Sequence, residues 1–441
     1  MINYDKSLIF KLRLLLAYRD ILRTKVPPIT KRYIQRFRTS QQEAAKRLKG
    51  KKKIDVAFFL TIPGMWKSDY LFRAMQANPK YHPYIVIYPY SQYKGFSRKH
   101  IQDTIEQTRK FISEKGYEYV IPYDKKRGKW LDVKKTLNPD IVFFSSPYKD
   151  HLPKYFIYHF ADTLTCYLSY GFQIFSYYYQ LGYNLLFHNL VGCYFLETPI
   201  HKDIAIANSR IHGANGIVTG YPATEVFLDK TYTPHDTWKP QAKPMKRVIW
   251  APHQSIEESG TLSLSTFLIY HDTMLKLADK YANSIQFAFK PHQLLKFKLQ
   301  MVWGVEKTEE YYRKWDERPN TQLEESSYVD LFLTSDAMIH DSASFTTEYI
   351  FTQKPVMFLV RNDKVREKLS PFGEKMFDAH YHAHCAEDID KFLSDTILNG
   401  NDPKSAERND VFEKYLQPID GMMPSERIIY ELEKIINSSD K

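Results

Sequence analysis

The stretch DAMIHDSASFTTEYIFTQKPVMFLV, residues 336–360, changes character twice, and this pattern decides the fold class. A short apolar run at 337–339 stops at HDSAS, residues 340–344. A segment with helical spacing follows, and KP at 354–355 opens a second apolar run. Short apolar runs that alternate with helical segments are typical of buried parallel strands joined by crossover helices. The stretch therefore predicts a strand–helix–strand unit with a small, polar turn where the first strand ends.

The same alternation extends over most of the chain. Strand-like runs rich in β-branched and aromatic residues lie at 54–60, 84–90, 117–123, 140–146, 193–197, 216–222, 248–252, 285–292, 337–341 and 355–360. Helical spacing is found at 69–77, 98–115, 129–137, 200–212, 263–282 and 425–437. Strands that alternate with helices indicate parallel sheets built from βαβ units.

A segment rich in proline and lysine interrupts this rhythm at 229–247, and it is the predicted linker. At 441 residues the chain is also too long for a single compact core. We therefore expect two doubly wound, Rossmann-type α/β domains facing a cleft, over residues 54–228 and 248–441, with the last helix closing the second domain.

The overall composition predicts a folded protein of a reducing compartment, with no membrane-spanning segment. Hydrophobic residues make up 43% of the chain and charged residues 26%, as in ordinary folded domains. The cysteines Cys166, Cys193 and Cys385 are far apart and have no metal-ligand spacing, which predicts free thiols in a reducing compartment. The sequence has no signal peptide and no apolar run of membrane-spanning length, so we expect no transmembrane segment.

The net charge of +11 is concentrated in one segment. Residues 1–53 hold 16 Lys/Arg against three acids, and the rest of the chain holds 46 against 48. Apolar residues recur in this arm at helical spacing, namely Leu8, Ile9, Leu12, Leu15, Leu16 and Leu22. A basic amphipathic helix of this kind favours an anionic membrane surface. The alternative is a helix that packs on its own domain, and nucleic acid is disfavoured because no binding motif accompanies the charge.

Polar residues lie at the carboxyl ends of three predicted strands of the second half. His253 follows the first strand, Lys290 and His292 lie at the end of the next, and HDSAS at 340–344 lies at the end of the third. Ligands of parallel α/β sheets lie at these carboxyl ends, against helix N-termini. Small residues at a helix start let backbone N–H groups and serine hydroxyls approach an anion, which predicts a pyrophosphate site.

Two further features bear on this prediction. Glu348 lies one turn after Ser344 on the predicted helix, where its carboxylate could accept hydrogen bonds from a ribose. The alternative is that Asp341 or Ser342 simply caps the helix.

Several motifs, taken in order, resemble a known family. They are TGYP at 219–222, APHQS at 251–255, FKPHQ at 289–293, YVDLFLTSDAMIHDSASFTTEYIFTQKPVMFL at 328–359 and FEKYLQPIDGMMPSERI at 412–428. Together they resemble the CDP-glycerol glycerophosphotransferases of teichoic acid and capsule synthesis. The resemblance covers roughly residues 215–430, and the first half of the chain matches only loosely.

This resemblance implies a GT-B-like fold whose second domain holds the nucleotide. It implies transfer of a polyol phosphate, usually glycerol phosphate, from a CDP-linked donor to a hydroxyl of a lipid-linked or polymeric glycan acceptor. The reaction releases CMP at the cytoplasmic face of the membrane and needs no cofactor; we expect no metal site. The implied donor-binding residues are Lys290, His292, Asp341, Ser342, Ser344 and Glu348. His292 is also the implied catalytic group, and His253 is a further candidate ligand.

The sequence departs from the family pattern in the first domain. Members carry Trp-His-Gly there, with the histidine as the presumed base, whereas this chain has Ser169-Tyr170-Gly171. Tyr170 would then occupy the catalytic position, although a phenol with a pKa near 10 is a poor base at neutral pH. Two other functions therefore stay open: a glycosyltransferase or epimerase that uses a UDP-sugar, and a membrane-bound scaffold with a decayed site.

Two other segments have competing interpretations. Residues 155–195 contain 15 Phe/Tyr, which fits either an aromatic groove for a glycan or ordinary core packing. The run DAHYHAHCAED at 378–388 brings three histidines and a cysteine together and suggests a metal site. It fits better with a short strand that leads into a helix, so we favour a structural role.

Overall fold

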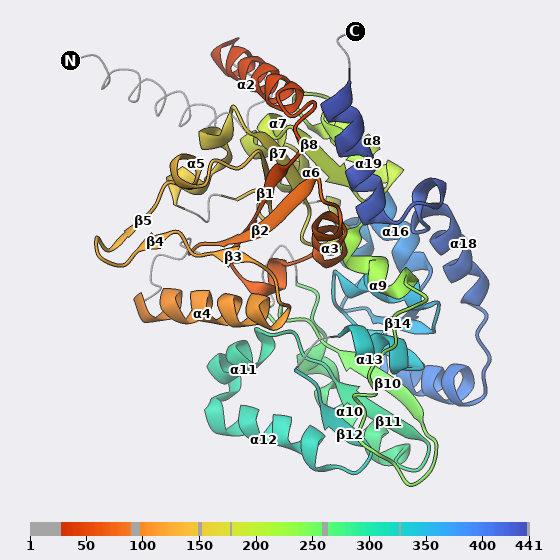
Figure 1. Ribbon diagram of the computed structural model, residues 1–441. Coiled ribbons are helices and arrows are strands. Elements are labelled where there is room, and N and C mark those ends of the chain that lie inside the picture. The colour runs from red at the N-terminus through yellow and green to blue at the C-terminus, as the bar shows by residue number, and fades with distance from the viewer. Residues whose placement is uncertain are drawn as a thin grey trace. The chain divides into compact units, whose positions relative to one another are not determined.

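The structure is a computed structural model, and it describes residues 28–89, 98–148, 152–176, 179–257, 263–325 and 328–438. The chain divides into two compact units (Figure 1). Unit 1 takes in the described residues within Met1–Gly171, Tyr178–Glu225 and Pro418–Lys441. Unit 2 takes in those within Phe172–Tyr177 and Val226–Gln417. Each unit is an α/β structure built on a parallel sheet, as the sequence predicts.

Unit 1 contains a seven-stranded sheet in the order β3-β2-β1-β6-β7-β8-β9, and every neighbouring pair is parallel. Its strands are β1 (Ile54–Leu60), β2 (Tyr81–Ile87), β3 (Tyr119–Val120), β6 (Ile141–Phe144), β7 (Leu164–Leu168), β8 (Cys193–Leu196) and β9 (Gly216–Val218). A small antiparallel hairpin, β4 (Tyr123–Asp124) and β5 (Lys129–Trp130), stands beside it.

The helices of unit 1 cover both faces of this sheet. They are α2 (Pro28–Lys46), α3 (Asp69–Ala77), α4 (Arg98–Glu114), α5 (Val133–Thr136), α6 (Tyr179–Tyr183), α7 (Leu186–Leu190), α8 (Pro199–Asn208) and α19 (Pro424–Asn437). Strand β1 is buried on both faces: Phe59 packs into one core and Phe58 into the other. This two-sided burial is why the strand is a continuous apolar run rather than an alternating one.

Unit 2 contains a six-stranded parallel sheet in the order β12-β11-β10-β13-β14-β15. Its strands are β10 (Lys246–Ala251), β11 (Ile285–Phe289), β12 (Thr321–Leu323), β13 (Ala337–His340), β14 (Val356–Leu359) and β15 (Tyr381–Ala383). Its helices are α10 (Phe267–Lys280), α11 (Leu295–Trp303), α12 (Val305–Glu317), α13 (Val329–Thr334), α14 (Phe345–Glu348), α15 (Lys364–Glu367), α16 (Pro371–Asp378), α17 (Ala386–Lys391) and α18 (Ser405–Tyr415). The chain passes from unit 1 to unit 2 within the short helix α9 (Glu225–Leu228).

Both sheets reverse their winding direction at one point. In unit 1 the chain builds outward from β1 through β2 to β3 and then restarts on the other side at β6. In unit 2 it builds from β10 through β11 to β12 and restarts at β13. Crevices that hold ligands form at such switch points, at the carboxyl ends of the strands. Ligand sites are therefore expected at the carboxyl ends of β1 and β6 and at those of β10 and β13.

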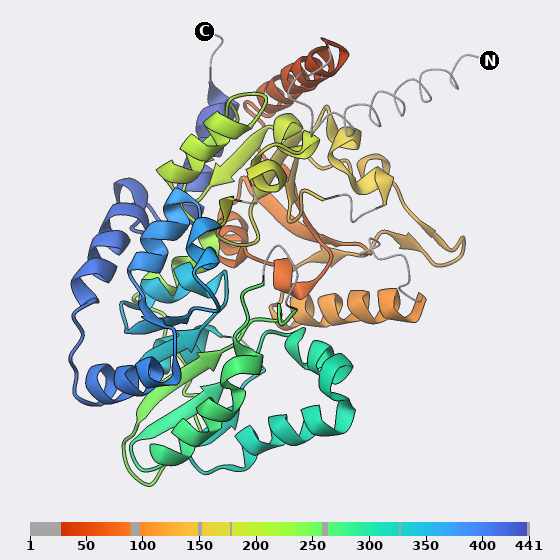
Figure 2. The ribbon, with the colours of Figure 1, turned by 180° about the vertical axis from the view of Figure 1, so that it is seen from behind.

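The chain connectivity differs from the predicted domains in two places. Helix α19 belongs to unit 1, where it contacts α3 and α2. Figures 1 and 2 show it beside α2. The segment 229–247 is bonded to unit 2 rather than being a free linker, since Trp238 is 5% exposed and its Nε1 donates to Thr334 Oγ1 at 3.0 Å.

Several predicted element boundaries were wrong. Strand β2 begins at Tyr81 rather than 84, because Pro83 is accommodated within the strand. The helix predicted at 129–137 is instead β5 followed by the four-residue α5. Strand β7 lies inside the aromatic segment 155–195 and was missed, although Asp162 before it and Ser169 and Gly171 after it are typical turn residues.

The basic arm divides into two parts. Helix α2 packs on unit 1: Ile34, Phe37 and Ala44 of the helix are buried there, and so is Leu48 just after it. For this half of the arm the structure supports the packing alternative. The amphipathic pattern at 8–22 lies outside the described residues. Among the described residues, no helix is both long enough and apolar enough to cross a membrane.

Candidate functional site

Two histidines meet at the strand ends of unit 2. His253 follows β10 and His292 follows β11, and the centroids of their rings are 5.2 Å apart at an interplanar angle of 66°. A backbone hydrogen bond from the His292 N–H to the Pro252 carbonyl, 3.0 Å long, continues the strand pairing into this turn. The prediction that these residues follow adjacent strands is confirmed, and β10 flanks the switch point.

Both rings are held in the same tautomer. The Ser255 N–H donates to His253 Nδ1 at 3.2 Å, and the Leu294 N–H donates to His292 Nδ1 at 3.1 Å. A neutral imidazole whose Nδ1 accepts carries its proton on Nε2. Burial lowers the pKa of His253 to about 3 and that of His292 to about 4. At neutral pH this pair therefore offers two uncharged N–H donors rather than positive charges.

Asp341 joins three segments of unit 2. Its Oδ1 accepts from the His253 N–H at 2.5 Å, and its Oδ2 accepts from the N–H and the hydroxyl of Thr266 at 2.5 and 2.8 Å. The carboxyl is fully buried, and burial raises its pKa to about 6 against the opposing effect of these hydrogen bonds. Asp341 thus positions the turn after β10 and the start of α10, with both oxygens occupied.

No side-chain capping bond forms at the start of α14. Ser344 is the N-cap of α14 but makes no side-chain capping bond, and Ser342 is 9% exposed. Helix α14 is only four residues long and continues as a 3₁₀ turn over Tyr349–Thr352, so it contributes little dipole. The serine hydroxyls and the turn backbone, rather than a long helix, are the groups available at this strand end.

Lys290 and Glu348 are both buried. Lys290 is 8% exposed, and burial lowers the pKa of its ammonium while the nearby Glu324 opposes that shift. Glu348 is 2% exposed, and the Tyr328 hydroxyl forms a hydrogen bond with it. The second oxygen, Glu348 Oε2, has no hydrogen-bond partner among the described residues. A buried, unpartnered carboxylate oxygen is costly unless a ligand or water supplies a donor.

Arg361 supports this edge and was missed by the sequence analysis. Its Nη1 donates to the carbonyl oxygens of Ser255 at 3.3 Å and Ser265 at 3.0 Å. These bonds tie the end of β14 to the segment that leads from β10 into α10. Arg361 follows the apolar run 355–360 directly, so its place after a strand was the available signal.

Tyr170 lies in unit 1, just beyond the end of β7, where its ring contacts Tyr148 at a centroid distance of 6.5 Å. The next strand, β8, ends beside a second group that the sequence analysis did not single out, Glu197. Glu197 is 4% exposed, and burial raises its pKa to about 7 while the Ser169 hydroxyl opposes the shift. Unit 1 therefore contains a carboxyl group that titrates near neutral pH.

Residues of both segments with competing interpretations pack in the interior. His380, His382 and His384 flank or belong to strand β15, which leads into α17; His380 Nδ1 contacts the Met376 carbonyl and the His382 ring stacks on Phe377. No group of three metal-ligating side chains occurs in the described part of the chain. Most described aromatics of 155–195 are core residues, as are Tyr155, Tyr167 and Phe187.

No family model and no curated protein sequence matches this chain. Among solved structures, the S. aureus MnaA–UDP complex matches with a TM-score of 0.53 and 15% identity, over 88% of this chain and 97% of that one. UDP-GlcNAc 2-epimerase from Neisseria meningitidis bound to UDP-GlcNAc gives 0.52 and 15%, over 86% and 99%. A variant of the wall teichoic acid polymerase TagF gives 0.53 and 12%, over 97% and 98%.

These similarities concern the fold, because the identities are low. The chain has a GT-B-like α/β fold with two Rossmann-type parallel sheets. This is the fold class that the alternation of strands and helices and the resemblance predicted.

Proposed function

We propose that the chain is a transferase that moves a polyol phosphate, most simply glycerol phosphate, from a CDP-linked donor to a hydroxyl of a lipid-linked or polymeric glycan acceptor. The observation that carries the proposal is the meeting of His253 and His292 at the strand ends around the switch point of unit 2, where Asp341, the residue before Ser342, accepts a hydrogen bond from the His253 N–H. Two neutral N–H donors beside a small, polar turn suit the oxygens of a pyrophosphate. The motif order of the sequence and the shared fold with a teichoic acid polymerase support the choice of donor.

In this reaction the acceptor hydroxyl oxygen attacks the phosphorus atom of the polyol phosphate. The bond from that phosphorus to the bridging oxygen breaks, and CMP leaves with the electron pair. His292 Nε2–H and the buried Lys290 ammonium would stabilise the negative charge that develops on the leaving phosphate. Asp341 holds the turn that presents these groups, and Glu348 Oε2 would accept a hydrogen bond from the ribose.

The acceptor hydroxyl must also lose its proton. Tyr170 stands where the resemblance expects a base, and Glu197, at the end of the neighbouring strand, has a pKa of about 7. A base whose pKa lies near the working pH is the better match for proton transfer. We therefore place Glu197 ahead of Tyr170 in this role.

The acceptor implies a membrane partner. In this proposal the protein works at the cytoplasmic face of the membrane, attached peripherally through the basic part of the chain that precedes α2. Helix α2 itself packs on unit 1 through its apolar face, so the contact with anionic lipid falls to the exposed bases of the arm.

The second candidate function is an epimerase or glycosyltransferase that uses a UDP-sugar. It is favoured by the fold shared with MnaA, whose structure contains UDP, and with a UDP-GlcNAc 2-epimerase bound to UDP-GlcNAc. The same strand-end site would hold either nucleotide, so the preference for a CDP or a UDP ligand separates the two functions. A scaffold with a decayed site would bind neither.

The deciding experiment is calorimetric titration of the purified full chain with CDP-glycerol, CDP-ribitol and UDP-GlcNAc. We expect a CDP ligand to bind best, and His292→Ala and Ser342→Ala each to weaken its binding about tenfold or more, the loss of one or two hydrogen bonds to a charged group. His271→Ala is the matched control, because His271 belongs to α10 and is absent from this strand-end group.

Each other outcome of the titration would contradict a different part of the proposal. Preference for the UDP-sugar, lost in His292→Ala, would keep the site and replace the reaction. Binding of a CDP ligand that both variants retain would remove these residues from the donor site. Failure of every nucleotide to bind the folded protein would favour the scaffold.

A further inference from the structure

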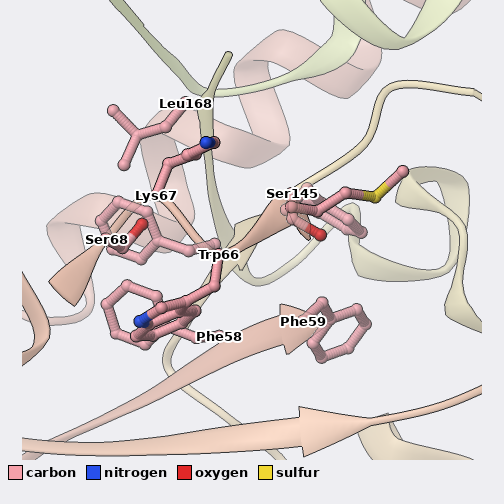
Figure 3. A pocket seen from close by; sticks show the side chains of 10 residues that line it. Phe58, Phe59, Trp66, Lys67, Ser68, Ser145 and Leu168 are labelled. Atoms are coloured by element: carbon pink, nitrogen blue, oxygen red, sulfur yellow. The ribbon is translucent and has the colours of Figure 1, made fainter. Parts of the chain in front are cut away.

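The carboxyl ends of β1 and β6 form only a small recess in unit 1. Its lining includes Trp66, Lys67 and Ser145 (Figure 3). It has room for about one water molecule, which is too little for a sugar or a nucleotide. A different part of unit 1, the hairpin β4–β5, is suited to a large partner.

The tip of this hairpin carries a concentrated positive charge. Residues 123–130 read YDKKRGKW, with four cations against one acid, a net charge of +3. The four cationic residues are all exposed, namely Lys125, Lys126, Arg127 and Lys129. Only Arg127 has an acidic neighbour among the described residues, Asp124 at 3.7 Å, and the Arg127 side chain is still 81% exposed. The tip therefore presents cations that the described residues leave largely unneutralised.

The backbone holds the tip in one shape. Asp124 Oδ1 accepts hydrogen bonds from the N–H of Lys126 at 3.0 Å and from that of Arg127 at 3.1 Å. Bonds of this kind stabilise tight turns. Gly128 has a φ of +62°, in the left-handed region that glycine adopts without strain. The one acid of the tip is thus engaged by its own turn, and the four cations are attached to a fixed frame.

The base of the hairpin is fastened to the core of unit 1. The hydroxyl of the buried Tyr155 donates to the Leu131 carbonyl at 2.7 Å, and the Tyr155 ring meets Trp130 edge-on at 6.4 Å. Trp130 in turn packs on Tyr123 at 5.1 Å, and Tyr123 is 40% exposed. Figures 1 and 2 show the hairpin extending away from the seven-stranded sheet of its unit. The result is a rigid, projecting tip with an exposed aromatic ring beside its cations.

These properties match a broad anionic surface better than a small anion. A small anion is usually held by a turn or a pocket that surrounds it, whereas here the cations are spread over a projecting loop. Each lysine or arginine near an anionic bilayer strengthens binding about fivefold. Tyrosine and tryptophan rings are enriched at the membrane–water interface, at the level of the lipid headgroups. The tip combines both kinds of group.

We infer that the tip of the hairpin β4–β5 is a contact site for an anionic membrane surface, in addition to the basic arm. The four cations lie against the lipid phosphates, and the Tyr123 ring lies at the level of the headgroups. The inference rests on the proposed function for the kind of partner. Membrane binding needs neither donor nor acceptor, so it is measured separately from the reaction, and the nucleotide titration can succeed or fail independently of it.

The test is co-sedimentation of the full chain with vesicles of phosphatidylcholine that contain about 30% phosphatidylglycerol, and with vesicles of phosphatidylcholine alone. We expect the neutral vesicles to bind at least about tenfold more weakly. Replacement of all four cations of the tip by glutamine should weaken binding to the anionic vesicles at least about tenfold, and Tyr123→Ser about threefold.

A matched control removes the same charge from other exposed positions. It replaces four cations whose side chains are 60–75% exposed by glutamine, namely Lys110, Arg313, Lys414 and Lys434. We expect this control to weaken binding less than about threefold, because screening limits the effect of distant charges. Equal weakening in the control and in the hairpin variant would overturn the inference, since net charge alone would then account for binding. Circular dichroism confirms that each variant is folded.

Hydrogen exchange of the wild type locates the contact without any substitution. Exchange at residues 124–130 should slow when anionic vesicles are added and stay unchanged with neutral ones. Unchanged exchange there with both kinds of vesicle would overturn the inference. Soluble polyphosphate is the competing partner: if it binds the wild type but not the hairpin variant, while both bind vesicles equally, the tip recognises a soluble polyanion instead of a membrane.

Discussion

At the scale of single residues, burial sets the charge state of the ionisable groups at the candidate sites. His253, His292 and Glu197 all have pKa values shifted toward their uncharged forms, because water is excluded from them. Sequence placed the two histidines at strand ends correctly. It did not find Glu197, because a glutamate after a four-residue apolar run is not distinctive until the neighbouring strand covers it.

Glu197 makes the stability of unit 1 depend on pH. Its pKa is about 7 in the folded state, against 4.5 for an ordinary glutamate side chain. Between pH 4.5 and 7 the folded state therefore keeps a proton that the unfolded state has lost. Stability therefore falls as the pH rises through this window, by about 3 kcal/mol for a shift of this size. The variant Glu197→Gln should be more stable than the wild type at pH 8 by up to this amount, and nearly equal at pH 4.5.

Urea unfolding followed by circular dichroism at both pH values measures this difference. Glu114→Gln is the control, since Glu114 lies on α4 with its side chain 63% exposed. A difference between Glu197→Gln and the wild type that is the same at both pH values would show that the carboxyl does not titrate in this window.

At the scale of elements, apolar runs predicted most strands, and long-range hydrogen bonds account for what they missed. The role of Asp341 depends on Thr266, which is 75 residues away in the sequence. The packing of α2 depends on Gln41, whose Nε2 donates to the carbonyl oxygens of Phe160 and Thr163 and whose Oε1 accepts from the Thr165 N–H. Neither partner set follows from local periodicity.

Gln41 should be a strong anchor for α2. The variant Gln41→Ala leaves buried backbone groups of unit 1 without partners, and we expect it to lower the free energy of unfolding by about 2–4 kcal/mol. Thermal and urea unfolding measure the loss. Gln42→Ala is the matched control, because the neighbouring side chain is exposed and should change stability by less than about 0.5 kcal/mol. Equal effects of the two substitutions would contradict the anchoring role.

At the scale of the whole molecule, the chain returns to its first unit at the end. Helix α19 places Ile428, Leu432 and Ile436 in a core of unit 1, four residues apart along one face. The Ser425 N–H and hydroxyl donate to the two carboxylate oxygens of Glu225 at 2.6 and 2.7 Å. The C-terminal helix therefore stabilises the unit that holds the N-terminal strands.

This connectivity predicts a distant effect of a C-terminal substitution. Leu432→Ala should cost about 2–5 kcal/mol, the usual range for a leucine removed from a core, and the loss should fall on unit 1. Hydrogen exchange followed by mass spectrometry should show lost protection in β1 and β2 and unchanged protection in β10 and β11. Tyr430→Ala, on the exposed face of the same helix, is the control. Lost protection in β10 and β11 would contradict the assignment of α19 to unit 1.

The α/β class, the approximate positions of most strands and the histidines and serines at the strand ends of unit 2 could all be predicted from the sequence. These follow from local periodicity and from the rule that turns after parallel strands share one edge. The sequence did not predict that α19 belongs to unit 1, which residues bond to Asp341, or the raised pKa of Glu197. It also did not predict that Trp66, Lys67 and Ser145 line one recess. These features depend on strand order and burial, which join residues far apart in the chain and leave no local pattern.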